Sequence, residues 1–215
     1  MSVLSDFLIK SYYIAYNFIN KNRVRLTEKN SLFYKDSYLS KVIIQVTGEN
    51  NCVSIGKNTK ISNLKITIWG SDNRLVIGEN CSIKGGELYF CGENCNIIIS
   101  DDTSIIAACI SVLEKRNSIK IGRDCMFAWG IDIRCGDGHP IVDIDSGLRL
   151  NPTKDILIQD HVWLAANVQV LKGVSIGKNC IIGARSVVTK DIPQNSLAVG
   201  VPAKVIKSNV MWNRK

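Results

Sequence analysis

Residues 158–188 read IQDHVWLAANVQVLKGVSIGKNCIIGARSVV, and an aliphatic side chain recurs in this segment at every sixth position. A small or β-branched residue stands four positions after each of the first five. A period of six matches neither the helical repeat of 3.6 nor the strand repeat of two. It indicates a chain that turns a corner every sixth residue and points one aliphatic side chain into a triangular prism. The aliphatic series is Ile158, Leu164, Val170, Ile176, Ile182 and Val188.

The same pattern continues upstream with a longer period. Residues 51–59, 73–81, 95–103 and 117–125 align without gaps, and each copy follows an alternating apolar segment and a polar turn. The spacing of 22 predicts coils with about four extra residues at one corner. Each coil buries its apolar ladder only between neighbours, so the stack is expected to be cooperative. We predict about seven coils, roughly 34 Å long at the spacing of parallel strands.

Composition excludes several classes of protein. The chain has 215 residues, of which 46% are hydrophobic, enough for one buried core. No apolar run approaches the roughly 20 residues that cross a bilayer, and residues 1–6 lack the features of a secretory signal. We expect a cytoplasmic protein, with the inner face of the membrane as a second location. Because no secretory signal is expected, we expect the eight cysteines to be free thiols. Cys81, Cys125 and Cys180 would fill small inward positions of the repeat.

Residues 162–207 resemble the C-terminal half of the hexapeptide-repeat acyltransferases, which include galactoside, maltose and bacterial surface-polysaccharide O-acetyltransferases. The resemblance implies an all-β, left-handed parallel β-helix over residues 42–207. A basic, partly helical segment, 1–41, would precede it, and a tail, 208–215, would follow. The resemblance also implies acetyl-CoA as co-substrate, a saccharide acceptor, and a homotrimer that binds the coenzyme between adjacent subunits.

The repeat is interrupted once, by a polar, glycine-rich loop at residues 134–156 that contains His139, one of only two histidines. Insertions in rigid repeat proteins often carry function. Transfer of an acyl group to a sugar hydroxyl needs a base that is partly neutral near pH 7, and imidazole meets that need. The resembling enzymes supply this base from a Gly-His-Pro loop, which 138–140 matches. Asp137, Asp143 or a backbone carbonyl is expected to orient the ring.

Two other side chains compete for a catalytic role. His161 stands at a repeat corner, where a structural role in a left-handed turn is expected. Cys135 precedes His139 by four residues and raises the idea of an acyl-cysteine intermediate. Direct transfer in the resembling family argues against that intermediate.

The resemblance assigns further residues to the two substrates. The Ala165-Ala166 turn would supply a backbone N–H to the oxyanion, and Trp163 would form a wall of the thioester site. Trp129 and Asp132 are candidates for sugar contact. Ala165-Ala166 replaces the commoner Gly-Ser or Gly-Ala pair, and Arg185 fills a position that is usually small. The expected coenzyme contacts are Ala166, Ala184, Arg185, Thr189, Lys190, Lys204 and Lys207.

The two ends of the chain carry its positive charge. The net charge is +8, with a net charge of +4 in residues 1–41 and +5 in residues 185–215. Apolar residues at helical spacing in 1–26 precede a basic cluster. Such a helix could cap the open end of the stack, form a trimer contact or lie on an anionic membrane.

The leading hypothesis is therefore a CoA-dependent O-acetyltransferase of a saccharide hydroxyl in a bacterial surface glycan. The alternatives are an N-acetyltransferase of an amino sugar and a non-catalytic β-helical scaffold. Two histidines per chain cannot supply the three zinc ligands of a β-helical carbonic anhydrase, so no metal is expected. The absence of an aromatic-basic recognition motif argues against nucleic acid as a partner.

Overall fold

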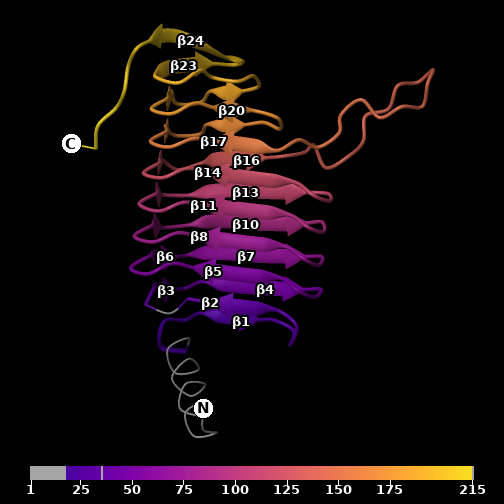
Figure 1. Cartoon of the computed structure of the whole chain (residues 1–215), viewed down its shortest axis with the longest axis vertical. Coiled ribbons are helices and arrows are strands. Elements are labelled where there is room, and N and C mark those ends of the chain that lie inside the picture. The colour runs from indigo at the N-terminus through magenta and orange to yellow at the C-terminus, as the bar shows by residue number, and fades with distance from the viewer. Residues whose placement is uncertain (1–17, 35, 215) are drawn as a thin grey trace, which may run out of the picture.

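The computed structural model describes residues 18–34 and 36–214, which wind into a parallel β-helix with three flat faces (Figure 1). The aliphatic residues of the repeat stack inside. Ile55, Ile77, Ile99 and Ile121 pair in register on successive strands and are almost completely buried. The core is thus one continuous ladder of Ile, Leu and Val between three sheets, and the expected fold class is confirmed.

Each face of the prism is one sheet. Sheet A contains β1 (Arg23–Arg25), β4 (Ile43–Thr47), β7 (Leu64–Trp69), β10 (Gly86–Cys91), β13 (Ala108–Leu113), β16 (Ile131–Arg134), β19 (Gln169–Val170) and β22 (Val187–Val188). Sheet B contains β2 (Ser31–Phe33), β5 (Cys52–Ile55), β8 (Arg74–Ile77), β11 (Asn96–Ile99), β14 (Ser118–Ile121), β17 (Ile156–Ile158) and β20 (Ser175–Ile176). Sheet C contains β3 (Tyr38–Ser40), β6 (Lys60–Ser62), β9 (Ser82–Ile83), β12 (Ser104–Ile105), β15 (Met126–Phe127), β18 (Trp163–Leu164), β21 (Ile181–Ile182), β23 (Ser196–Gly200) and β24 (Ala203–Ser208). All described pairs are parallel except β23 with β24.

The stack begins earlier than the repeat pattern indicates. Strands β1, β2 and β3 form a first coil from residues 23–41, which the sequence assigned to the N-terminal segment. Sheet A therefore has eight strands, one coil more than the seven expected. Among the described residues this first coil has a neighbouring coil on one side only, so its apolar spacing is less constrained. Most of the helix expected in 1–26 falls on residues 1–17, which lie outside the described residues.

The extra residues of the 22-residue coils mainly lengthen sheet A. Strands β7, β10 and β13 have six residues each, whereas β19 and β22 in the 18-residue coils have two. The longer strands extend beyond the shorter coils above them (Figure 1). The additional residues of these coils therefore lie in the strands of sheet A as well as at the corner where they were expected.

Left-handed backbone conformations make the corners. At the corner between sheets B and C, one residue of each of eight coils has a φ between +52° and +63°. Asparagine and aspartate tolerate this region because their short side chains bond locally. The eight residues are Asp36, Asn58, Asn80, Asp102, Asp124, His161, Asn179 and Asn195.

The cysteines serve as small core residues and free thiols, as the sequence indicates. All eight are free, and Cys81, Cys125 and Cys180 are buried in the inward positions predicted for them. Neighbouring coils are linked there by a threonine, since the hydroxyl of Thr59 donates to the carbonyl of Gly78 and accepts from the N–H of Cys81.

A stability prediction follows from two adjacent glycines. Gly86 has a φ of +116°, and a Cβ added there would lie 2.0 Å from the carbonyl oxygen of Ala108. At Gly85 the nearest atom would be 3.7 Å away. We expect Gly86→Ala to lower the free energy of unfolding in urea by at least about 2 kcal/mol. Gly85→Ala is the matched control and should lie close to wild type; equal stability of the two variants would contradict this account of the corner.

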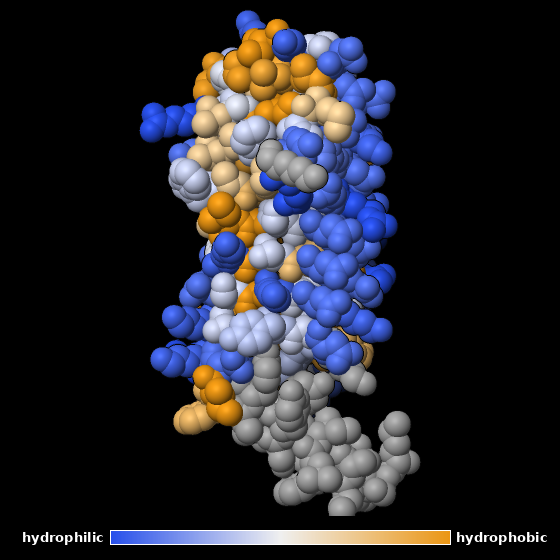
Figure 2. Space-filling model, turned by 90° about the vertical axis from the view of Figure 1, so that its left-hand side faces the viewer, coloured by the Kyte–Doolittle hydropathy of each residue, from blue (hydrophilic) through white to orange (hydrophobic). Residues whose placement is uncertain are grey.

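Two segments leave the stack. The loop between β16 and β17 projects far from the prism, as the break in the repeat predicts, and the chain after β24 runs back down one side (Figure 1). Figure 2 shows that side, with apolar side chains gathered over the upper, C-terminal coils and a band of polar side chains beside them.

Within residues 18–34 and 36–214, no helix is long and apolar enough to cross a membrane.

Candidate functional site

The loop that carries His139 leaves the corner between sheets A and B, at the end of β16. His139 is exposed, and its ring nitrogens make no hydrogen bond to the described part of the chain. Its backbone is nevertheless held, because the side-chain amide of Asn151 donates to the His139 carbonyl at 2.9 Å. The imidazole is thus presented to solvent from a fixed backbone.

Asn151 joins the two ends of the loop. Its side chain is buried, donates to the carboxylate of Asp137 at 2.7 Å and accepts from the N–H of Ile141 at 2.6 Å. Lys172, on the next coil, forms an ion pair with the same carboxylate and donates to the Asn151 carbonyl at 3.2 Å. The hydrogen bond from Lys172, with that from Asn151, holds the pKa of Asp137 below its ordinary value. Asp137 is therefore charged at neutral pH and fixes the base of the loop.

A second ion pair braces the loop against the stack. The guanidinium of Arg149 bonds both carboxylate oxygens of Glu114, with one N–O distance of 2.9 Å. This contact keeps the pKa of Glu114 below its usual value. Because Glu114 lies on the coil next to the one that carries the loop, the pair ties the loop to the stack and limits how far it can swing.

Neither carboxylate proposed to orient the ring of His139 contacts that ring. Asp137 bonds Asn151 and Lys172, and Asp143 accepts from the N–H and hydroxyl of Ser146 inside the loop turn. Asp137 therefore acts on the backbone around His139. The sequence pointed to Asp137 and missed Asn151 and Lys172, because contacts across 14 and 35 residues depend on the return path of the loop.

The corner between sheets C and A carries the Ala165-Ala166 turn. The N–H of Ala165 donates to the carbonyl of Ile182 at 2.9 Å, so it is engaged in the stack. The N–H of Ala166 has no backbone acceptor in the described chain, and its carbonyl accepts from Arg185 at 2.9 Å. Asn167 follows in the left-handed region, with a φ of +60°. The backbone of the stack thus leaves the N–H of Ala166 free to donate at this corner.

Trp163 leads into that corner on sheet C. It pairs in register with Met126 below and Ile181 above, and its side chain is half-buried. These outward-facing residues form an apolar column beside Ala166. Strand β24 adds Lys204 opposite Val199 and Lys207 opposite Leu197 at the top of the same sheet.

Four expected coenzyme contacts are cations without acidic partners. In the described chain no ion pair involves any of them, and all are exposed. Unpaired guanidinium and ammonium groups suit phosphate oxygens. Arg185 and Ala184 lie beside Ala166 at the corner between sheets C and A, whereas Thr189 and Lys190 follow β22 at the corner from which the loop leaves. The four cations are Arg185, Lys190, Lys204 and Lys207.

The two candidate sugar contacts lie near the corner between sheets C and A. Trp129 is 58% exposed at the corner itself. Asp132 faces outward on β16 and forms an ion pair with Arg134, with one N–O distance of 3.1 Å. Asp132 and Arg134 line an open cavity of about 320 Å³ with Cys109 and Gly130. The cavity is large enough for one sugar ring.

The predicted residues thus fall into two groups at opposite ends of sheet A. Ala166, Ala184 and Trp129 lie where strands of sheet A begin, and the loop of His139 leaves where β16 ends. Gly130 to Cys135 is five residues of extended chain, about 16 Å. The loop then projects away from the prism (Figure 1). One chain therefore does not bring His139 and Ala166 together.

The structure also bears on the competing residues. His161 has a φ of +55° at the corner between sheets B and C, which is the structural position expected of it. Cys135 is fully buried, and burial raises the pKa of its thiol to about 11. A thiol that stays protonated at neutral pH is a poor nucleophile.

Over residues 18–34 and 36–214, no group of three or more His, Cys, Asp or Glu side chains could hold a metal ion.

Known proteins share this architecture. The family model described as bacterial transferase hexapeptide (six repeats) matches residues 155–190. A polysialic acid O-acetyltransferase of Escherichia coli O1:K1 / APEC is 41% identical over 109 residues, 51% of this chain and 36% of that protein. A polysialic acid O-acetyltransferase of Neisseria meningitidis is 37% identical over 107 residues, 49% of each chain. The matches thus span between about a third and a half of these curated relatives.

A solved structure matches over a longer range. The crystal structure of the polysialic acid O-acetyltransferase OatWY superposes with a TM-score of 0.82, at 34% identity, over 90% of each chain. This likeness confirms the left-handed parallel β-helix, including the coils upstream of residue 155.

Proposed function

The chain belongs to the bacterial hexapeptide-repeat transferases, and from that premise we propose that it transfers the acetyl group of acetyl-CoA to a saccharide hydroxyl. The observation that carries the proposal is the Gly-His-Pro loop, anchored by Asn151 and Asp137, which presents an otherwise unbonded imidazole where the repeat is interrupted. The O-acetyltransferase names of the relatives support the same reaction.

His139 acts as the general base. Its imidazole accepts the proton of the acceptor hydroxyl as the oxygen attacks the thioester carbonyl. The N–H of Ala166 donates to the oxyanion of the tetrahedral intermediate, since it has no other backbone partner. When the carbon–sulfur bond breaks, the imidazolium returns the proton to the departing sulfur. The ester forms and His139 is neutral again.

The site is composed from two chains. His139 and Ala166 lie at opposite ends of sheet A within one chain, so a neighbouring copy must supply one of them. Threefold symmetry would place the A–B corner of one copy against the C–A corner of the next. The exposed apolar side chains of the loop support burial against a second copy. They are Ile141, Val142, Ile144, Leu148 and Leu150.

The same arrangement accounts for the distribution of cations. Lys190 lies on the loop side of the shared cleft, and Arg185, Lys204 and Lys207 lie on the Ala166 side. A coenzyme between two such corners would have its phosphates contacted from both sides. Trp163 forms the apolar wall next to the thioester.

We propose an anionic bacterial surface glycan as acceptor, with polysialic acid as the first compound to test, because two curated relatives and OatWY bear that name. The cavity beside Asp132 and Arg134 offers both hydrogen-bond acceptors and a guanidinium to a sugar ring. Trp129, which precedes the lining residue Gly130 in the chain, offers an exposed aromatic face.

Release of free thiol from acetyl-CoA tests this function. Purified protein is incubated with polysialic acid, a galactoside, maltose or glucosamine, and the product is examined by mass spectrometry. We expect thiol release with a hydroxyl acceptor and an alkali-labile ester in the product. An alkali-stable amide formed only with glucosamine would favour an N-acetyltransferase. If no acceptor caused thiol release, the remaining hypothesis would be a non-catalytic scaffold.

A further inference from the structure

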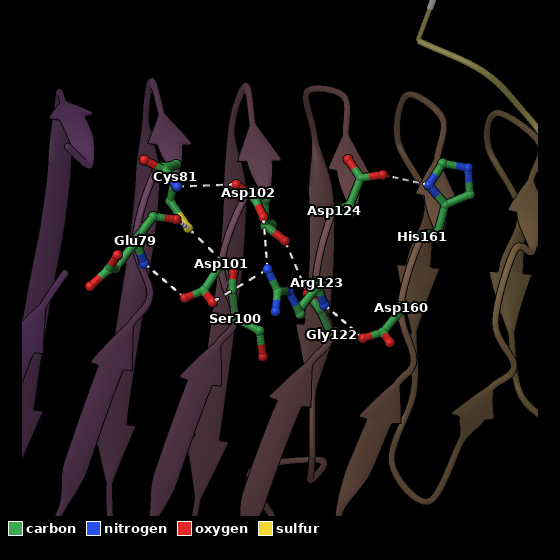
Figure 3. Close-up of polar contacts among 12 residues, drawn as sticks. Glu79, Cys81, Ser100, Asp101, Asp102, Gly122, Arg123, Asp124, Asp160 and His161 are labelled. Atoms are coloured by element: carbon green, nitrogen blue, oxygen red, sulfur yellow. Dashed lines mark hydrogen bonds and ion pairs between the residues drawn. The ribbon is translucent and has the colours of Figure 1, made fainter. Parts of the chain in front are cut away.

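One position in the corner between sheets B and C departs from the rule that its neighbours follow. Seven of the eight left-handed residues there are asparagine or aspartate, and the eighth is His161. Figure 3 shows its ring beside Asp124 of the preceding coil, near the row formed by Asp101, Asp102, Arg123 and Asp160. Asparagine adopts the left-handed conformation of this corner as readily as histidine does. The turn therefore does not explain the imidazole, and the contacts of its ring point to a further role.

The segment after β24 docks on that imidazole. Trp212 is only 5% exposed, and its indole stacks on the His161 ring with centroids 4.2 Å apart and planes 5° from parallel. The indole N–H donates to the His161 carbonyl at 2.8 Å. The ring nitrogens of His161 face the Asp124 carboxylate at 2.7 Å and the Trp212 carbonyl at 3.1 Å. Both are acceptors, so a ring protonated on both nitrogens donates to both.

Arg214 extends the docking across the next coils. Its guanidinium donates to the Asp124 carboxylate at 2.8 Å, to the Ser104 hydroxyl at 2.9 Å and to the Cys125 carbonyl at 3.0 Å. Burial alone would raise the pKa of Asp124, but the hydrogen bonds from Arg214 and His161 outweigh it and lower the pKa. The carboxylate therefore stays charged, and the segment is held by the ion pair of Arg214 with Asp124 as well as by stacking.

The docked indole also reaches the apolar wall of the proposed acetyl-CoA site. Its centroid lies 6.3 Å from that of Trp163, with the planes at 54°. Trp163 stands on the two-residue strand β18, and the turn with the free Ala166 N–H follows. Along the stack its register partners are the non-aromatic side chains of Met126 and Ile181. Within the described residues, Trp212 is the aromatic side chain in ring contact with Trp163.

We propose that Trp212 is a positioning residue of the acetyl-CoA site, acting through Trp163, with His161 as the platform on which it docks. The inference rests on the proposed function. Side chains preset in their bound geometry lose less conformational freedom when the ligand arrives. Loss of the Trp212 indole therefore weakens coenzyme binding and leaves acceptor binding unchanged, since Trp212 docks on His161 at the corner between sheets B and C, whereas Trp129 and Asp132 lie at or beyond the corner between sheets C and A.

The test compares three variants of the tail by calorimetric titration with coenzyme A and by turnover. Trp212→Ala is expected to raise the Kd of coenzyme A about tenfold and to change the KM of the acceptor less than twofold. Trp212→Phe keeps a ring on His161 and should recover most of the affinity. Met211→Ala is the matched control, because Met211 is 67% exposed on the same segment. It should behave as wild type.

His161→Asn provides a second route to the same result. Asparagine occupies this left-handed position in other coils, so the corner is kept while the platform is lost. This variant should reproduce the affinity loss of Trp212→Ala. An unchanged Kd in both variants, or an equal weakening for coenzyme and acceptor, would overturn the inference and leave a purely structural tail. Failure of the proposed function is distinguishable, since wild type would then bind coenzyme A without releasing thiol; absence of coenzyme binding by wild type would overturn both.

Discussion

Replacing His139 with alanine is expected to lower turnover by at least about 100-fold, the usual contribution of a general base. The melting temperature should not change, because the ring is exposed and bonds nothing in the described chain. The backbone contact from Asn151 survives the substitution, since it uses the His139 carbonyl. Turnover is measured by thiol release at saturating acetyl-CoA, and stability by thermal unfolding.

Asp145→Asn is the control for His139→Ala. Asp145 is exposed in the same loop, and its carboxylate forms no ion pair within the described residues. This variant should keep wild-type turnover. If His139→Ala also retained the wild-type rate, His139 would be excluded as the base.

Ala166→Pro is expected to lower kcat by about 100-fold to 1000-fold, the range observed when one oxyanion donor is lost. Proline removes the N–H that the structure leaves free at this corner. The turn itself should remain, because proline is favoured immediately before a left-handed residue such as Asn167. The KM of acetyl-CoA should change much less than kcat, since the bond forms mainly in the transition state.

Lys57→Pro is the matched control for this substitution. Lys57 stands directly before the left-handed Asn58, on a coil far below the site, and its N–H has no backbone acceptor in the described chain. It should retain wild-type kcat. A normal kcat in Ala166→Pro would show that the oxyanion is stabilised elsewhere.

The repeat predicted most of the fold because its physical basis is local. An aliphatic residue at every sixth position, from Ile158 to Val188, has no simple alternative to the three-sided coil. The first coil was missed because, among the described residues, it has a neighbouring coil on one side only, and its Val24 and Leu32 are half-buried and do not keep the strict spacing.

The candidate site was only partly visible in the sequence. His139 could be identified because the loop interrupts a regular pattern. The sequence spacing also implies that the expected coenzyme contacts lie on different corners. Ala184 and Lys190 are six residues apart, and a six-residue period places them on successive corners. The contacts of Asn151 with Asp137 and of Trp212 with His161 could not be predicted, because they depend on the paths of two segments that leave the repeat.

Co-expression of His139→Ala and Ala166→Pro chains tests most directly whether one site is built from two chains. Each variant alone is expected to be nearly inactive. In mixed threefold assemblies, roughly a quarter of the sites combine an intact loop with an intact corner, by random assortment around a symmetric ring. We therefore predict that thiol release returns to about a quarter of the wild-type rate. Activity no greater than that of the separate variants would contradict the shared site.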